Sequence, residues 1–177
     1  PDILAARSLK RLVSLLRSAR HAGRGVIWSL GAHVLKCGLS PYLVALMERG
    51  YITHLALNGA GIIHDFEIAF CGETSEDVGE SIRDGSFGTS KETGEFLGEA
   101  LRDERSREDG LGLGAVMGKR IVEAQLPHRE HSLLARAWEL QVPVTVHAAL
   151  GADVVHIHPA CDWPLLANLL RRDFESF

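Results

Sequence analysis

The sequence contains little cysteine, no excess of basic residues and no long hydrophobic run. Its three cysteines, Cys37, Cys71 and Cys161, are odd in number and far apart, a pattern that predicts free thiols in a reducing cytoplasm and no disulfide framework or zinc knuckle. A net charge of −4 without a basic stripe argues against a nucleic-acid partner. No stretch approaches the roughly 18 consecutive apolar residues of a membrane span, and the first residues lack the apolar region of a signal peptide. We therefore expect a cytoplasmic protein that binds neither nucleic acid nor a membrane.

The composition is that of a globular protein. Hydrophobic residues make up 46% of the 177 residues and charged residues 24%, values typical of a folded domain with a core. We find no internal repeat and no linker, so we expect a single α/β domain over residues 1–177.

Alternating strand and helix patterns predict a mainly parallel sheet. Apolar runs predict strands at residues 25–30, 52–57, 143–149 and 153–158. Helical periodicity predicts helices at residues 3–20, 40–47, 62–70, 90–107, 115–124, 131–140 and 164–172. Residues 71–89 are rich in Gly, Ser and acids and are expected to form a loop with one helical turn.

Two neighbouring strands open into polar, glycine-containing loops. Ser29, Gly31, His33 and Lys36 follow the first strand; Asn58, Gly59, Gly61, His64 and Asp65 follow the second. The carboxyl ends of parallel strands form the ligand crevice of α/β proteins, so these loops predict a binding site.

The stretch Asn58-Gly59-Ala60-Gly61 has two interpretations. Its amides can face a bound anion at a helix N-terminus, or the turn can simply require glycine; the added polarity favours a ligand. Asp65 can stabilise the helix N-terminus or accept a hydrogen bond from a ribose hydroxyl or a cationic substrate. The later run GLGLGAVMG (residues 110–118) follows a charged helix rather than a strand, which favours a helix connection over a phosphate loop.

Histidines gather near the end of the chain. His147, Asp153, His156 and His158 lie within twelve positions, and His156 and His158 would share one face of a strand. Imidazoles on one face can bind metal, shuttle protons or bind substrate. We interpret the group as a site, with metal the less favoured use because no helical Glu/His motif supplies further ligands.

The order of these motifs resembles the deoxyhypusine synthase family, in its bacterial branch. The similar segments are GAHVLKCG, MERG, LNGAGIIHD and VPVTVHAALGADVVHIHP, which span about residues 25–160. The resemblance implies a three-layer, Rossmann-like NAD-binding fold, a homotetramer or dimer in the cytoplasm, and NAD-dependent transfer of an aminobutyl group from a spermidine-like polyamine to an amine acceptor, either a protein lysine or a small amine.

The resemblance also implies roles for particular residues. His158 matches the catalytic histidine that lines the polyamine pocket. The residues implied to bind NAD are Ala32, His33, Val34, Lys36, Asn58, Gly59, Ala60, Asp65, Gly151, Ala152 and Asp153. No metal is implied.

The family's catalytic lysine has no counterpart in this chain. Its four lysines, Lys10, Lys36, Lys91 and Lys119, all lie outside the expected position downstream of His158. The resemblance therefore implies a C-terminally incomplete or inactive member of the family. The alternatives are a metal-dependent hydrolase and a non-catalytic binding or assembly module of the same fold. The hydrolase would be built on His64, Asp65, His147, His156 and His158.

Overall fold

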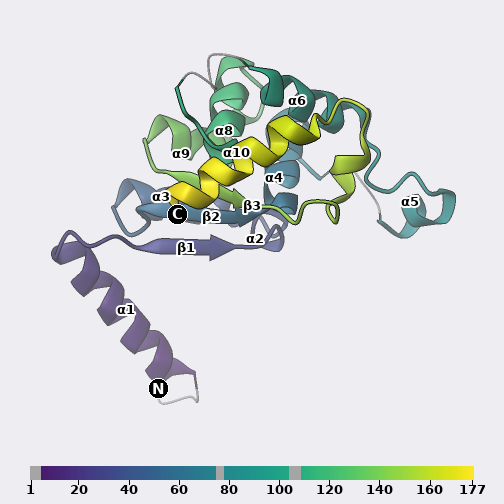
Figure 1. Ribbon diagram of the computed structural model, residues 1–177. Helices are drawn as coiled ribbons and strands as arrows, with labels where there is room; N and C mark the ends of the chain where they lie inside the picture. The colour runs from purple at the N-terminus through teal and green to yellow at the C-terminus, as the bar shows by residue number, and fades with distance from the viewer. Residues whose placement is uncertain (1–4, 75–77, 104–108) are drawn as a thin grey trace.

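The computed structural model describes residues 5–74, 78–103 and 109–177 and shows a mixed α/β fold, mostly helical, with a small parallel sheet (Figure 1). The strands are β1 (Ile27–Leu30), β2 (His54–Asn58) and β3 (Val144–His147). The helices are α1 (Ala6–His21), α2 (His33–Lys36), α3 (Ser40–Glu48), α4 (Gly59–Cys71), α5 (Val78–Asp84), α6 (Lys91–Arg102), α8 (Leu113–Glu123), α9 (Leu133–Glu139) and α10 (Trp163–Ser176), with 3₁₀ helices η1 (Arg129–His131) and η2 (Val154–Ile157).

The three strands are parallel and lie in the order β1-β2-β3. Leu55 and Leu57 of β2 pair in register with Val144 and Val146 of β3, and all four side chains are buried. Side chains alternate between the faces of a strand, so these residues form one apolar face of the sheet. The parallel sheet expected from the sequence is confirmed.

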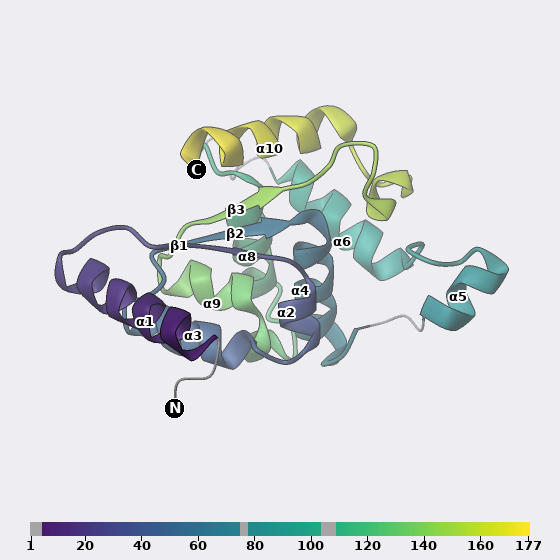
Figure 2. The ribbon, with the colours of Figure 1, turned by 90° about the horizontal axis from the view of Figure 1, so that it is seen from below.

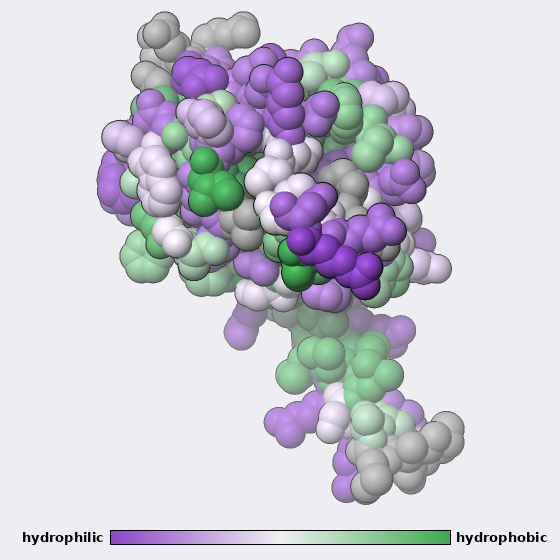
Figure 3. Space-filling view, turned by 90° about the vertical axis from the view of Figure 1, so that its right-hand side faces the viewer, coloured by the Kyte–Doolittle hydropathy of each residue, from purple (hydrophilic) through white to green (hydrophobic). Residues whose placement is uncertain are grey.

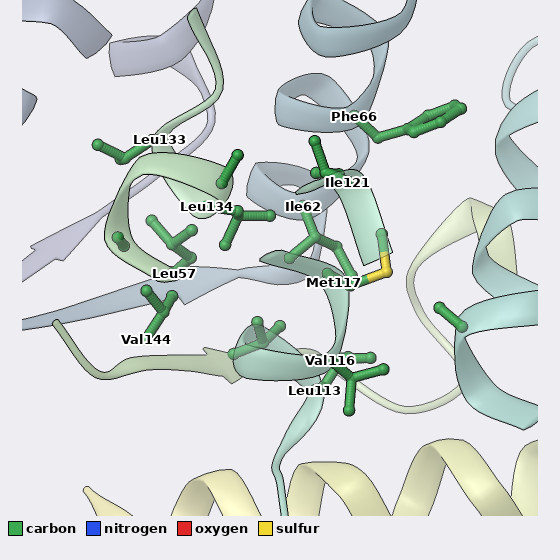
Figure 4. Close-up of a cluster of buried hydrophobic side chains, with 14 of the residues drawn as sticks. Leu57, Ile62, Phe66, Leu113, Val116, Met117, Ile121, Leu133, Leu134 and Val144 are labelled. Carbon is green, nitrogen blue, oxygen red and sulfur yellow. The ribbon is translucent and has the colours of Figure 1, made fainter. Parts of the chain in front are cut away.

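Helices cover the two faces of the sheet unequally. Figure 2 shows α3, α4, α8 and α9 on one side of the strands and α10 on the other. The larger group meets the apolar face, where Leu57 and Val144 pack among Ile62 of α4, Met117 and Ile121 of α8 and their neighbours (Figure 4). This core fixes the ends of β2 and β3, from which the polar loops leave the sheet.

Helices α4, α9 and α10 each begin at a short polar side chain that accepts a hydrogen bond from the first helical turn. Asn58 accepts a hydrogen bond from the Gly61 N–H at 3.0 Å and begins α4. Ser132 accepts one from Ala135 N–H at the start of α9, and Asp162 one from Leu165 N–H at the start of α10. Each satisfies one of the N–H groups that a helix leaves free in its first turn.

The expected strand at residues 153–158 is wrong. The chain turns away from the sheet just after β3, where Ala152 N–H donates to the Ala149 carbonyl at 2.9 Å, and residues 154–157 form the 3₁₀ helix η2. A strand would have placed His156 and His158 on one face, whereas the 3₁₀ helix separates them. Residues 71–89 also hold more helix than the expected single turn, in α5, and residues 104–108 of the helix expected at 90–107 lie outside the described residues.

The amphipathic helix α1 projects from the body of the molecule (Figure 1). None of its residues is buried, and Figure 3 shows apolar side chains along this projection beneath the body. Its C-terminal end is held by Arg20, whose Nε donates to the Arg49 carbonyl at 2.5 Å and whose guanidinium lies 5.0 Å from the centre of the Tyr51 ring.

Across the described ranges, every helix is either too short or too polar to cross a lipid bilayer.

Candidate functional site

The loops after all three strands line one cavity of about 520 Å³. The part of the wall that follows β1, β2 and β3 consists of Gly31, Ala32, His33, Lys36, Asn58, Gly59, Ala60, Ile63, His64, Glu67, Ala152, Asp153 and Val155. The segment from α5 to α6 closes the remainder with Val78, Phe87, Gly88, Ser90 and Thr93. The volume lies within the range of about 300–1,000 Å³ typical of small-molecule sites.

Asp153 approaches the first residue of α4 very closely. A Cβ built on Gly59 would lie 1.8 Å from Asp153 Oδ2 and 3.2 Å from the Ala148 Cβ, so only glycine fits at this position. The glycine after β2 is therefore required by the carboxylate that arrives from the β3 loop. This packing joins two of the three loops that build the cavity.

The Oδ2 atom of Asp153 is buried and has no hydrogen-bond partner within residues 5–74, 78–103 and 109–177. A buried carboxylate oxygen without a donor is unfavourable. The side chain belongs to the cavity wall, so a donor group of a bound ligand, such as a hydroxyl, is the natural partner for this carboxylate.

Positive and negative side chains share the cavity. His33 and Lys36 of α2 are exposed at its wall, and the first turn of α4 adds the partial positive charge of a helix N-terminus. Glu67 and Asp153 supply carboxylates. A ligand that carries both anionic groups and hydroxyl or amine donors matches this distribution.

His64 and Glu67 form a hydrogen-bonded pair in the wall. They lie three residues apart on α4, and His64 Nδ1 is 2.7 Å from Glu67 Oε2. The His64 side chain is about a quarter exposed, at 24%, and that of Glu67 is 6% exposed. His64 was expected among the polar residues after β2, whereas Glu67 was not, although the spacing of three residues on one helix face was a usable signal.

Eight of the residues expected to bind a cofactor line the cavity. They are Ala32, His33, Lys36, Asn58, Gly59, Ala60, Ala152 and Asp153. The part of the wall that sequence reasoning missed comes mainly from residues 78–93. Residues up to 89 were interpreted as a loop and residues 90–93 as the start of a helix, and nothing in their local pattern indicates where this segment folds back.

The other expected residues lie elsewhere. Val34 packs against the hydrophobic core, and Gly151 is an exposed turn residue with a φ of +81°. His158 packs its ring on Gly94 of α6, where an added Cβ would lie 2.1 Å from the imidazole, and its Nδ1 accepts a hydrogen bond from the Ala160 N–H at 3.1 Å. His158 is therefore a packing residue at this position and is not among the residues that line the cavity.

Asp65 is fully buried and caps a helix. Its carboxylate accepts hydrogen bonds from the Ser132 hydroxyl and from the Leu133 and Leu134 N–H groups at 2.7 and 3.1 Å. Burial raises the pKa of Asp65 to about 6, against the opposing effect of these hydrogen bonds. Asp65 thus holds the start of α9 and does not reach the cavity wall.

The glycine run at residues 110–118 is a packing element. A Cβ on Gly112 would lie 1.9 Å from Asp173 Oδ1, and one on Gly114 would lie 2.2 Å from the Val144 carbonyl oxygen. The run begins α8 with its backbone against β3 and α10, in agreement with the helix-connection interpretation. It is not part of the cavity.

The histidines near the end of the chain do not form a cluster. His156 is buried with its ring 5.5 Å from that of Trp163, and burial lowers its pKa. His147 lies 3.0 Å from the Thr145 hydroxyl and stacks edge-on with Phe177. Within the described parts of the chain, no three His, Cys, Asp or Glu side chains are placed to hold a metal ion, so the hydrolase alternative lacks its ligands there.

No protein-family model matches the chain, and no curated protein sequence does. Among solved structures, the chain is similar to a protein of Methanococcus maripaludis S2 described as a conserved LOR/SDH protein, with a TM-score of 0.56 and 18% sequence identity. The similarity covers 93% of this chain and 46% of the other, so this chain spans about half the length of that protein. At this identity the likeness shows the fold alone.

The expected membership of the deoxyhypusine synthase family is wrong. No family model supports it, and the structural neighbour carries a different name. The expected transfer of an aminobutyl group from a polyamine is withdrawn with it. The segments behind the resemblance are strand ends and glycine turns, which many parallel α/β proteins share whatever their chemistry. What these comparisons establish is a mixed α/β fold shared with half of a LOR/SDH-type protein.

Proposed function

We propose that the cavity binds NAD and that β1, β2 and β3 with their loops form a Rossmann-like dinucleotide site. One observation carries the proposal: the loops after three adjacent parallel strands line a single cavity, with the glycine-containing first turn of α4 in its wall. Ligands of open α/β sheets bind at this edge.

The charges of the wall fit the parts of a dinucleotide. The N–H groups in the first turn of α4 and the ammonium of Lys36 suit the pyrophosphate, because both supply positive charge. The carboxylate of Asp153 suits a ribose hydroxyl, since its buried Oδ2 has no donor within the described residues. Apolar side chains of Ile63 and Val155 offer surface for a base or a nicotinamide ring.

Calorimetric titration of the 177-residue chain with NAD tests the proposal. We expect saturable binding in the micromolar range, about −8 kcal/mol. ADP-ribose should compete with NAD, because it carries the pyrophosphate and both riboses.

A charge-reversal pair assigns the binding to the cavity. Lys36→Glu should weaken NAD binding at least tenfold, because it places a carboxylate against the pyrophosphate. Lys10→Glu is the matched control: Lys10 is exposed on α1, and the same change of charge there should leave the affinity within twofold. Absence of saturable binding, or equal losses in the two variants, would contradict the proposal.

A further inference from the structure

The pair formed by His64 and Glu67 has the geometry of a proton-transfer dyad. Both side chains lie on one face of α4, one turn apart, and both belong to the cavity wall. The distance of 2.7 Å between His64 Nδ1 and Glu67 Oε2 is that of a charge-assisted hydrogen bond. A carboxylate that accepts from Nδ1–H holds the imidazole in one tautomer, with the lone pair on Nε2.

The exposed fractions of the two side chains indicate which of them a ligand can reach. Glu67 is 6% exposed and is held within the wall, whereas the His64 side chain keeps 24% of its surface accessible. The imidazole is therefore the member of the pair that a ligand can reach, and the carboxylate orients it from behind. A carboxylate behind a histidine also stabilises the imidazolium that forms when the ring takes up a proton.

A second histidine–glutamate pair, His131 and Glu130, lies at the protein surface and serves as a comparison. His131 and Glu130 are adjacent in sequence, their side chains are 55% and 61% exposed, and Nε2 lies 3.6 Å from Oε1. Water competes for both partners there. His64 and Glu67 are distinguished from such a pair by burial, by the shorter distance and by their place in a cavity.

We propose that His64 is the general base of this site and that Glu67 is its positioning residue. The inference rests on the proposed binding of NAD. That cofactor supplies a hydride acceptor, and oxidation of an alcohol or amine also requires that the substrate lose a proton. His64 Nε2 takes that proton: the substrate O–H or N–H bond breaks, its electron pair stays on the oxygen or nitrogen, and an N–H bond forms on the imidazole.

The cavity defines the class of substrate. Val78 and Phe87 are apolar, while His33 and Ser90 add polar groups, and none of these four residues is assigned to the dinucleotide. A small alcohol or amine that carries a further polar group fits these walls once the dinucleotide occupies its part of the cavity. The titratable side chains among the residues that line the cavity are His33, Lys36, His64, Glu67 and Asp153.

The dyad itself is tested by nitrogen NMR of the histidine rings at pH 8. His64 should appear as one tautomer with its proton on Nδ1, and Glu67→Gln should give a mixture of tautomers. Glu130→Gln is the matched control and should leave His131 unchanged, since that exposed pair does not fix a tautomer. Mixed tautomers of His64 in the unsubstituted chain would overturn the positioning role of Glu67.

The place of His64 in the site is tested by carbethoxylation with diethyl pyrocarbonate, read for each histidine by mass spectrometry. Saturating NAD should slow modification of His64 at least tenfold and leave His131 unchanged. In assays of NAD reduction with a panel of small alcohols and amines, His64→Gln should lower turnover at least a hundredfold while its NAD affinity stays within threefold.

The outcomes separate the two proposals. If calorimetry detects no NAD binding, the proposed function fails and this inference fails with it. If NAD binds but His64 is modified at the same rate, or if His64→Gln turns over as fast as the unsubstituted chain, only the role of His64 is overturned. Glu67→Gln provides a second variant should His64→Gln not fold, and it should lower turnover at least tenfold with NAD affinity retained.

Discussion

The carboxylate of Asp173, in α10, accepts a hydrogen bond of 2.8 Å from the backbone N–H of Val146, in β3. The same Oδ2 atom accepts a second hydrogen bond, of 3.1 Å, from the Gly114 N–H in the first turn of α8. One buried side chain therefore serves both the edge of the sheet and the start of a helix. It holds three elements in the arrangement that fixes the end of β3.

Replacing Asp173 should destabilise the protein strongly. Asp173→Ala leaves buried N–H groups, those of Gly114 and Val146 among them, without acceptors, and we expect the free energy of unfolding to fall by about 2–4 kcal/mol. Urea unfolding measures the change. Glu175→Ala is the control, because Glu175 is exposed and pairs with Arg171 in the same helix; it should change stability by less than about 0.5 kcal/mol. Similar values for the two variants would contradict the assigned role.

Asp65 should give stability an unusual dependence on pH. Its pKa is raised from 3.8 to about 6 in the folded protein, so between these values the folded state binds the proton more tightly than the unfolded state. The contribution is favourable below about pH 4, is lost as pH rises towards 6 and is constant above. The difference in unfolding free energy between the unsubstituted chain and Asp65→Asn should therefore fall by about 2 kcal/mol from pH 4 to pH 7.

Asp84 provides a comparison, because its pKa is shifted in the opposite direction. Hydrogen bonds from Ser86 lower the pKa of this exposed carboxyl, so its small contribution should be present above about pH 4 and be lost as pH falls below that value. The difference in unfolding free energy between the unsubstituted chain and Asp84→Asn should rise with pH. If the same difference for Asp65→Asn also rises with pH, the pKa of Asp65 is not raised.

Gly59→Ala should disturb the cavity by displacing Asp153. The added Cβ would meet Asp153 Oδ2 at 1.8 Å, and we expect a loss of about 1–3 kcal/mol in stability together with weaker NAD binding. Gly25→Ala is the control, since its Cβ would meet only the Thr53 hydroxyl, at 3.7 Å. The double variant Gly59→Ala, Asp153→Ala should recover part of the stability; if it recovers none, the clash with Asp153 is not the cause.

We expect helix α1 to pack against a second copy of the chain. Leu9 and Leu12 are 61% and 52% exposed on its apolar stripe. Five of the 19 basic residues and none of the 23 acidic ones lie in α1, so the rest of the chain carries a net charge of −9. The helix of one copy and the body of another are therefore complementary in charge.

Sedimentation equilibrium tests this association. The unsubstituted chain should form at least a dimer, and Leu9→Glu with Leu12→Glu should dissociate it. Ser14→Glu with Ser18→Glu adds the same charge to exposed positions on the opposite side of the helix and should weaken the assembly much less. A monomeric unsubstituted chain would overturn the prediction.

Local signals in the sequence predicted most of the fold. Asn58 before a glycine turn and Ser40-Pro41 before an apolar run marked helix starts that the structure has within a few residues. The strand expected at 153–158 was wrong because Val154, Val155 and Ile157 favour strands locally, while the turn at Ala149 takes the chain out of the sheet. The strand preference of single residues carries no information about a turn that removes the segment from the sheet.

Only the part of the cavity wall that comes from the loops directly after the strands was predictable from the sequence. The loops at residues 31–36 and 58–60 and Asp153 line the cavity as expected for strand ends. Asp65 and His158 were assigned to a ligand because of the family resemblance, which rested on strand ends and glycine turns. Their partners, Ser132 for Asp65 and Gly94 for His158, are more than sixty residues away along the chain, so no local pattern could reveal their structural roles.

The position of Asp173 bears on the order in which the chain folds during synthesis. Its hydrogen bonds span 27 and 59 residues of sequence, and contacts of such separation form slowly. While the ribosome still holds α10, the edge of β3 and the first turn of α8 keep unsatisfied N–H groups. The cavity loop that leaves β3 therefore acquires its final anchoring only when α10 has emerged, after the three strands and α8 have been synthesised.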